Sequence, residues 1–147
     1  MMTDKNQIMK QKYPIEAGNF TLAGEASGQI KKVLKQLGVD SNIVRRVTVA
    51  AYEAEMNMVI HSVGGNLTLQ VTPDRITVIA EDRGPGIPDI DLAMQEGYST
   101  APEMARELGF GAGMGLPNIK RCADILNVHS KMGEGTLLEA HFDIKAR

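Results

Sequence analysis

Apolar residues recur at helical spacing in two long stretches of the first half of the chain. Between residues 23 and 37 the apolar positions share one helical face, and Gly38 follows where a helix-ending glycine belongs. A second helix is predicted to begin at Asp40 or Ser41, because both are good N-caps, and to end near Ser62. The pattern therefore predicts two consecutive helices ahead of the β-rich part of the chain.

Segments rich in β-forming residues dominate the second half. Asn66–Thr72 and Arg75–Ala80 predict two strands joined by a turn-forming Pro-Asp pair. After a third helix, predicted at Gly115–Leu126, the segments Asn127–Lys131 and Thr136–Ile144 predict a closing hairpin. Strands joined by tight turns favour a mixed, mostly antiparallel sheet, and three main helices can cover one of its faces. The expected fold class is therefore α/β, a two-layer sandwich.

The segment between the two predicted hairpins has a different character. Residues 90–95 could form a short helix, whereas Glu96–Met114 is rich in glycine and shows no clear periodicity. Long loops of this kind in compact domains are often functional lids. We therefore expect a long loop with a functional role here.

The 147 residues of the chain are enough for one domain with a real hydrophobic core. We expect that single domain to span residues 13–147 and to begin with a short extended piece at residues 13–16. Residues 1–12 are polar, and they are expected either to be disordered or to lead into an edge strand.

Composition and charge weigh against several classes of function. The formal net charge is −2, so the electrostatics give no reason to expect nucleic acid or an anionic membrane as a direct partner. No segment approaches the roughly 18 apolar residues of a membrane span. The sequence has one cysteine, Cys122, which excludes an internal disulfide and favours a reducing, cytoplasmic setting.

The second predicted helix carries a polar stripe that borders its apolar face. Glu53, Asn57 and His61 are spaced by four residues, which aligns them on one side of a helix. A carboxylate can accept a proton from an attacking hydroxyl, and an amide oxygen suits Mg²⁺. Taken alone, such a stripe is more often a solvated helix face.

A glycine-containing turn directly follows the strand predicted at Arg75–Ala80. It starts from Asp82, and Gly84 and Gly86 follow at intervals of two residues. A carboxylate at the end of a strand can accept a donor from a ligand base, and glycines let the backbone approach closely. Taken alone, the same pattern is an ordinary surface turn.

A second glycine-rich segment runs into the third predicted helix. Gly111, Gly113 and Gly115 alternate with other residues up to the start of that helix. Free N–H groups at a helix start bind anions, and small residues let phosphates come near them. The pattern is neither a P-loop nor a G-x-G-x-x-G fingerprint, and taken alone it could be a flexible linker.

In their order and spacing these motifs resemble those of the GHKL ATPases. Glu53-x-x-x-Asn57 is similar to the N box of that superfamily, and the turn that starts from Asp82 is similar to the G1 box. The glycine-rich segment that ends at Gly115 resembles the G2 box, and the Gly-Thr pair that ends at Thr136 resembles the last element. The resemblance implies the GHKL, or Bergerat, ATP-binding fold.

Within that superfamily the chain resembles the bacterial anti-sigma-factor serine/threonine kinases, and among them the switch kinases. The segments Ile79–Ile90, 97–100 and Gly113–Arg121 carry most of the likeness, which covers about residues 20–144. One departure is the segment 101–110, which is longer than in the short switch kinases.

The resemblance implies a role for each matching residue. Asp82 would bind the adenine amino group of ATP, with Thr136 assisting through water. Asn57 would hold Mg²⁺, and Glu53 would be the catalytic base. The remaining matching residues are glycines, of which the first two would shape the adenine pocket and the last three would lie against the phosphates: Gly84, Gly86, Gly111, Gly113 and Gly115.

The loop at Glu96–Met114 is expected to act as a lid that ATP orders. Its glycines lower the cost of a conformational change, and Arg106 is a candidate contact for the γ-phosphate. An exposed arginine on a floppy loop is the plainer alternative for this residue.

Three functions are compatible with this reading. The first is a serine/threonine protein kinase that uses ATP and Mg²⁺ to phosphorylate a small antagonist protein in bacterial regulation. The second is a catalytically weak, ATP-gated binding module that sequesters a sigma-factor-like regulator, and a homodimer is compatible with both. A detached histidine-kinase ATPase domain ranks last, because no candidate phospho-acceptor histidine precedes Glu53 in a helical pair. Glu53 itself favours the kinase, since a binding module needs no base.

Overall fold

The computed structural model describes residues 8–16, 18–19, 22–61, 64–83, 115–131 and 133–144. The elements in this part follow in the order β1 (Met9–Ile15), α1 (Glu25–Gln36), α2 (Ser41–His61), β2 (Gly65–Val71), β3 (Arg75–Asp82), α5 (Gly115–Cys122), β4 (Ile125–Lys131) and β5 (Gly135–Asp143). The predicted helices and hairpins in this part are therefore confirmed. The short helix expected at 90–95 and the loop expected at 96–114 lie outside the described residues.

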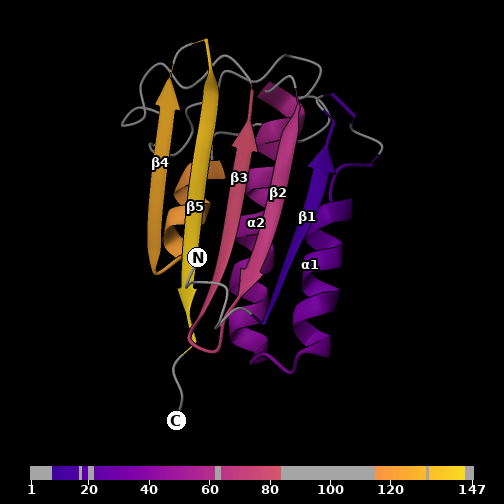
Figure 1. Ribbon diagram of the computed structural model, residues 1–147, viewed down its shortest axis with the longest axis vertical. Helices are drawn as coiled ribbons and strands as arrows, with labels where there is room; N and C mark the ends of the chain where they lie inside the picture. Colours follow the sequence, from indigo (N-terminus) through magenta and orange to yellow (C-terminus); the bar gives the residue numbers. More distant parts are fainter. Residues whose placement is uncertain are drawn as a thin grey trace.

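The described strands form one five-stranded sheet in the order β1-β2-β3-β5-β4. All four pairings between neighbouring strands are antiparallel. In the hairpin of β2 and β3, Thr72 donates its backbone N–H to the carbonyl of Arg75, which closes the tight turn predicted there. Strand β3 lies in the middle of the sheet, so its end is flanked by β2 on one side and β5 on the other (Figure 1).

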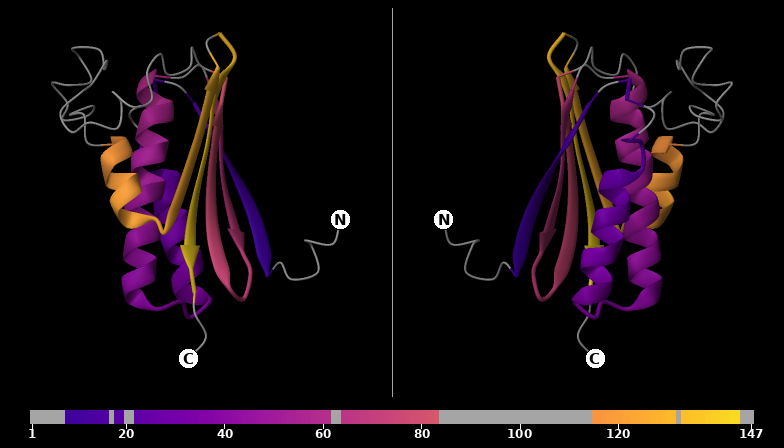
Figure 2. Two further views of the ribbon diagram at one scale, coloured as in Figure 1. Left: turned by 90° about the vertical axis from the view of Figure 1, so that its left-hand side faces the viewer. Right: turned by 90° about the vertical axis from the view of Figure 1, so that its right-hand side faces the viewer.

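The helices α1, α2 and α5 all cover the same face of the sheet (Figure 2). Leu69, Val78 and Ala140 are register partners across three neighbouring strands, and each is fully buried. Burying a leucine or valine side chain contributes roughly 1.5–3 kcal/mol, so this face provides the main hydrophobic core. Further core residues come from helices and strands alike: Ile30, Leu34, Val47, Ala51, Leu67, Ile76, Ile119 and Phe142. The predicted two-layer α/β sandwich is confirmed.

The edge strand β1 begins at Met9, ahead of the extended piece expected at residues 13–16. Of the two alternatives for the N-terminal segment, entry into an edge strand is the one that the structure shows for residues 9–12. Met9 pairs with Val71 of β2, and the pairing continues along the whole strand. The polar sequence of residues 9–12 does not signal a strand by itself, because its partner is distant in the sequence.

The sequence pattern predicted that the third helix ends at Leu126, but α5 ends at Cys122. Leu126 instead belongs to β4, where it pairs with Ala140. Leu126 and Val128 both pack against the core, so the apolar period at this point is two residues and the segment is a strand.

A charged network ties α2 to the far end of β3 and β5. Arg46 donates from Nε to the carbonyl of Cys122 at 2.8 Å, and its Nη2 lies 3.2 Å from Asp124 Oδ1. Asp124 also accepts the backbone N–H of Asp143, whose carboxylate binds Arg75 at 3.0 Å. The N–H of Asp143 is the main reason why the pKa of Asp124 is lowered, and the Arg46 guanidinium adds to the effect.

None of the helices in the described ranges combines the length and the apolar character that a membrane-spanning helix needs.

Candidate functional site

Glu53 and Asn57 lie one turn apart on α2, and both face helix α5. The Nδ2 atom of Asn118 donates to Oε2 of Glu53 at 3.0 Å. A Cβ atom added to Gly115 would lie 3.3 Å from Oδ1 of Asn57, so the start of α5 packs closely against this amide. Both side chains on α2 are half-buried. The stripe expected as a solvated helix face is therefore partly covered, and α5 covers it.

Asp82 is the last residue of β3, and it is held from the neighbouring strand β5. The backbone N–H of Thr136 donates to Oδ1 of Asp82 at 3.2 Å. The hydroxyl of Thr136 lies 3.1 Å from the hydroxyl of Ser130 on β4, within hydrogen-bonding distance. The structure thus brings together the predicted pair Asp82 and Thr136, and it adds Ser130, which no sequence motif had marked.

Glycines on both neighbouring strands let the backbone close tightly around Asp82. A Cβ on Gly65 of β2 would collide with the carbonyl oxygen of Glu81, and a Cβ on Gly135 of β5 would collide with the carbonyl oxygen of Asp82. Gly135 also has a φ of 124°, a conformation that side chains disfavour. The Gly-Thr pair predicted from the sequence therefore has a steric role at this point of the sheet.

These two groups lie at the same end of the molecule. The end of the molecule that is uppermost in Figure 1 is the one toward which four parts lie: the C-terminal half of α2, the end of β3 and the starts of α5 and β5. The glycines of the two predicted loops and the candidate arginine fall outside the described residues: Gly84, Gly86, Gly111, Gly113 and Arg106. The predicted lid at 96–114 falls outside them as well.

The residues at this end fit a nucleotide with its metal in their chemistry. Asp82 presents carboxylate oxygens, which can accept an amino group. Asn57 offers an amide oxygen, a hard ligand of the kind that Mg²⁺ prefers. In the described ranges, no group of three or more histidine, cysteine, aspartate or glutamate residues could hold a metal. Mg²⁺ usually takes only one or two ligands from the protein and the rest from phosphate and water, so Asn57 suits it.

Sequence reasoning missed Glu55, which faces the opposite side of α2. Its side chain is only 2% exposed. It accepts the backbone N–H groups of Gly24, Ala26 and Ser27 at 3.0, 3.3 and 2.9 Å, all at the start of α1. Helix α1 has no capping hydrogen bond from its own N-cap, Gly24, so Glu55 supplies the cap from another helix. A glutamate on the apolar face of α2, together with a helix start lacking a capping side chain, was the available signal.

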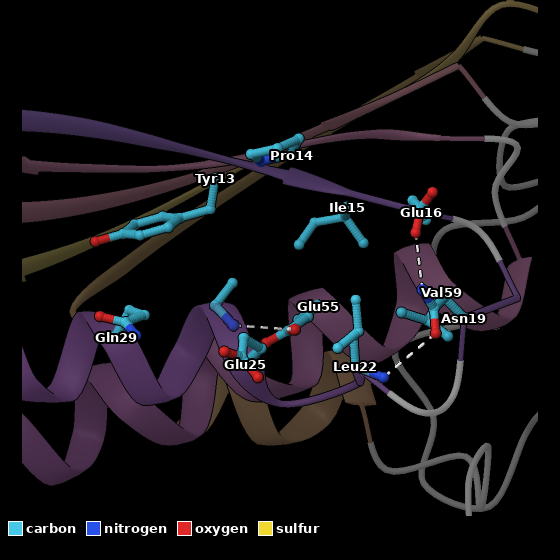
Figure 3. A pocket seen from close by; sticks show the side chains of 11 residues that line it. Tyr13, Pro14, Ile15, Glu16, Asn19, Leu22, Glu25, Gln29, Glu55 and Val59 are labelled. Carbon is cyan, nitrogen blue, oxygen red and sulfur yellow. Dashed lines mark hydrogen bonds between the residues drawn. The ribbon is translucent and has the colours of Figure 1, made fainter.

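A cavity of about 220 Å³ adjoins Glu55 between β1 and the two long helices. Tyr13 and Ile15 point into it from β1, and Leu22 and Val59 face them from the helical side (Figure 3). It lies across α2 from Glu53 and Asn57, so neither of these residues lines it. The cavity is therefore separate from the predicted site, although Ile15 is in register with Gly65 of β2, whose partner on β3 is Asp82.

Three features together define the GHKL, or Bergerat, class of ATPase domain. They are an antiparallel sheet covered by three helices, an acidic residue at the end of the central strand, and a Glu-Asn stripe that faces a helix start. A family model described as the histidine kinase-like ATPase domain matches residues 20–142. The chain belongs to this family.

Within this family, the chain is similar in sequence to a serine/threonine kinase and to anti-sigma factors. The chain is 36% identical over 114 residues to the serine/threonine-protein kinase RsbT of Bacillus subtilis, covering 75% of this chain and 80% of that protein. It is 33% identical over 97 residues to an anti-sigma F factor of Clostridium kluyveri, covering 63% of this chain and 65% of that one. An anti-sigma F factor of Caldanaerobacter subterraneus is 29% identical over 138 residues, with 90% and 91% covered.

Solved structures agree on the fold. The mycobacterial sensor histidine kinase MprB matches with a TM-score of 0.53 and 19% identity, covering 90% of this chain and 97% of that one. A chain of the SiaB–SiaC complex of Pseudomonas aeruginosa matches with a TM-score of 0.61 and 16% identity, covering 95% and 92%.

Proposed function

We propose that this protein is an ATP-dependent serine/threonine protein kinase of the anti-sigma-factor, switch-kinase type. Its substrate would be a serine or threonine on a small antagonist protein. The observation that carries the proposal is the pairing of Glu53 and Asn57 on one face of α2, against the start of α5. Kinship with RsbT, which is named a serine/threonine-protein kinase, supports the same reaction.

Glu53 is the candidate base of this reaction. The substrate hydroxyl oxygen attacks the γ-phosphorus, the bond from that phosphorus to the bridging oxygen of ADP breaks, and the hydroxyl proton passes to the Glu53 carboxylate. Asn118 uses one acceptor site of Oε2, and a carboxylate has about four such sites. Room therefore remains on the carboxylate for the proton of the substrate.

Asp82 and Thr136 are the candidate adenine contacts. The carboxylate of Asp82 would accept an N–H of the adenine amino group, and Thr136 would assist through its hydroxyl. The hydrogen bond from the Thr136 backbone to Asp82 fixes the distance between these two groups. Gly84 and Gly86 would shape the pocket around the ring.

Asn57 would hold Mg²⁺, which when bound neutralises negative charge on the phosphates. Phosphoryl transfer depends mainly on positioning and charge stabilisation, so a metal ligand beside the candidate base is well placed. The phosphates would lie against the glycines that lead into α5 and begin it, namely Gly111, Gly113 and Gly115. The lid at 96–114, with Arg106 toward the γ-phosphate, would then exclude water.

A second function is supported by the names of other relatives. Several are anti-sigma F factors, so an ATP-gated module that sequesters a sigma-factor-like regulator is the alternative. A homodimer and a cytoplasmic setting are compatible with both functions. The two functions differ in one respect, namely whether phosphate reaches the partner.

The test is transfer of label from γ-labelled ATP. The protein is incubated with Mg²⁺, the labelled nucleotide and small antagonist or sigma-factor-like proteins from the same genome, and phosphoamino acids are then identified. The kinase predicts labelled serine or threonine on one partner. An ATP-dependent complex without transfer would favour the binding module. Neither transfer nor ATP binding would refute both functions.

A further inference from the structure

We propose that Asn118 is a positioning residue for the Glu53 carboxylate, and that Arg121 sets the orientation of the Asn118 amide. This inference rests on the proposed function, because it concerns the candidate base of that reaction. Asn118 stands one turn into α5, four residues before its last residue, Cys122. It does not belong to the glycine pattern or to the Glu-Asn stripe, and its role would be to aim the base.

The hydrogen bonds around Asn118 leave one chemically consistent orientation for its amide. Arg121 donates from Nη2 to the amide oxygen, and an arginine side chain carries donors alone. The amide oxygen must therefore face Arg121, and the amide nitrogen faces the carboxylate of Glu53 at 3.0 Å. An ionised carboxylate can only accept, so both ends of the amide are correctly matched.

A neutral donor suits a carboxylate that has to accept a proton. A lysine or arginine bonded directly to a carboxylate favours its ionised form and so weakens it as a base. An amide N–H fixes the position of the carboxylate without placing a full positive charge on it. The exposed Arg121 stays one residue further away and acts through the amide.

Helix α5 makes two contacts with α2 that are one helical turn apart. Gly115 packs against Asn57, and Asn118 binds Glu53. Because the two helices run in opposite directions across this contact, one face of α5 holds the side chains of both the candidate metal ligand and the candidate base, which α2 places one turn apart. A base whose carboxylate rotates freely would lose this fixed relation to the γ-phosphate.

The test compares Asn118→Ala with Glu53→Gln and with the double variant in the full chain. Turnover is measured at saturating Mg·ATP as release of labelled inorganic phosphate. In this reaction a water oxygen attacks the γ-phosphorus, the bond to ADP breaks and the proton passes to Glu53. ATP affinity is measured by calorimetry and folding by thermal melting. Lys120→Ala, on the exposed side of the same helix, is the matched control.

We expect Asn118→Ala to lower turnover about 10- to 100-fold, the usual value of a hydrogen bond to a charged group. ATP affinity should stay within threefold, and Lys120→Ala should behave like the wild type. In the Glu53→Gln background, Asn118→Ala should cause no further loss, because a positioning residue has nothing left to position.

Four results would overturn this inference. Full turnover in Asn118→Ala, with Glu53→Gln inactive, removes the role of Asn118 and leaves the proposed function intact. A further loss of turnover when Asn118→Ala is added to Glu53→Gln would show that Asn118 acts on the nucleotide or the fold. A loss of ATP affinity as large as the loss of turnover would show the same. A wild type that neither hydrolyses ATP nor transfers phosphate would refute the proposed function and this inference together.

Discussion

Two glutamates on helix α2 stand two residues apart in the sequence and face opposite sides of the helix. Glu55 is 2% exposed, and it accepts three backbone N–H groups at the start of α1. Glu53 is half-buried, and it accepts a hydrogen bond from the neutral amide of Asn118. The same side chain on the same helix therefore meets two different environments.

The difference separates a structural carboxylate from one that can do chemistry. The three donors around Glu55 satisfy groups that a helix start leaves without partners, so its negative charge stabilises the fold. Glu53 keeps acceptor sites at the end of the molecule where Asp82 and the start of α5 also lie. Environment, and not residue type, distinguishes the structural glutamate from the one that we propose as the base.

The largest expected effect is that of Glu53→Gln on phosphoryl transfer. This change keeps the shape of the side chain and removes its basicity, so transfer should fall by roughly 10²–10⁴-fold. ATP should still bind, and the free energy of unfolding should change by less than about 0.5 kcal/mol. Single-turnover transfer from labelled ATP measures the first quantity and urea unfolding the last. A variant that transfers at the wild-type rate would deprive Glu53 of its role.

Glu55→Gln is the matched variant on the other side of the helix. Its amide would turn one donor toward backbone N–H groups that need acceptors, which should destabilise the protein by about 2–3 kcal/mol. Urea unfolding measures this loss. Transfer per folded molecule should stay close to the wild-type value. If Glu55→Gln proved as stable as the wild type, the cap on α1 would contribute little to the free energy of unfolding.

Asp82→Asn probes a carboxylate that combines features of both glutamates. Like Glu55 it accepts a backbone N–H, from Thr136, and like Glu53 it is only half-buried. An asparagine oxygen can keep the bond to Thr136 while its nitrogen presents a donor to the adenine amino group. The mismatch should weaken ATP binding about 10- to 100-fold, as calorimetry would show. Unchanged affinity would contradict the role of Asp82 in adenine binding.

Asn57→Ala should separate metal binding from nucleotide binding. Removing one amide oxygen should weaken Mg·ATP about tenfold while metal-free ATP loses much less. Calorimetry with Mg²⁺ and with a chelator in its place gives the two affinities. Equal losses in both would count against Asn57 as the metal ligand.

The smallest expected effect concerns acid stability and a carboxylate outside α2. The pKa of Asp124 is lowered in the folded state, first by the N–H of Asp143 and then by Arg46. Its contribution is therefore full above the usual aspartate value of about 4 and is lost as the pH falls through the lower folded pKa. Because Asp124 is partly exposed, this contribution should be below about 1 kcal/mol. Urea unfolding should show Asp124→Asn to be less stable at pH 7 by that amount, and the difference should shrink as the pH falls below about 4.

Periodicity and motif spacing determined most of the architecture and the candidate site. The apolar faces of both long helices and the two hairpins follow from local patterns, because helices and tight turns are specified by residues close in the sequence. The pairing of Asp82 with Thr136, which are 54 positions apart, was implied only by the resemblance to the GHKL ATPases. Local patterns also mark Glu53 and Asn57 as one stripe.

Only the tertiary structure decided which residues meet that stripe and which carboxylate is structural. Asn118 reaches Glu53 across 65 positions of sequence, and Glu55 reaches Gly24 across 31. Contacts of this kind depend on how α1 and α5 pack on the two sides of α2, and no repeat or spacing in the chain encodes them. The end of α5 at Cys122 has the same origin, because pairing of Leu126 with Ala140 turns a helical pattern into a strand.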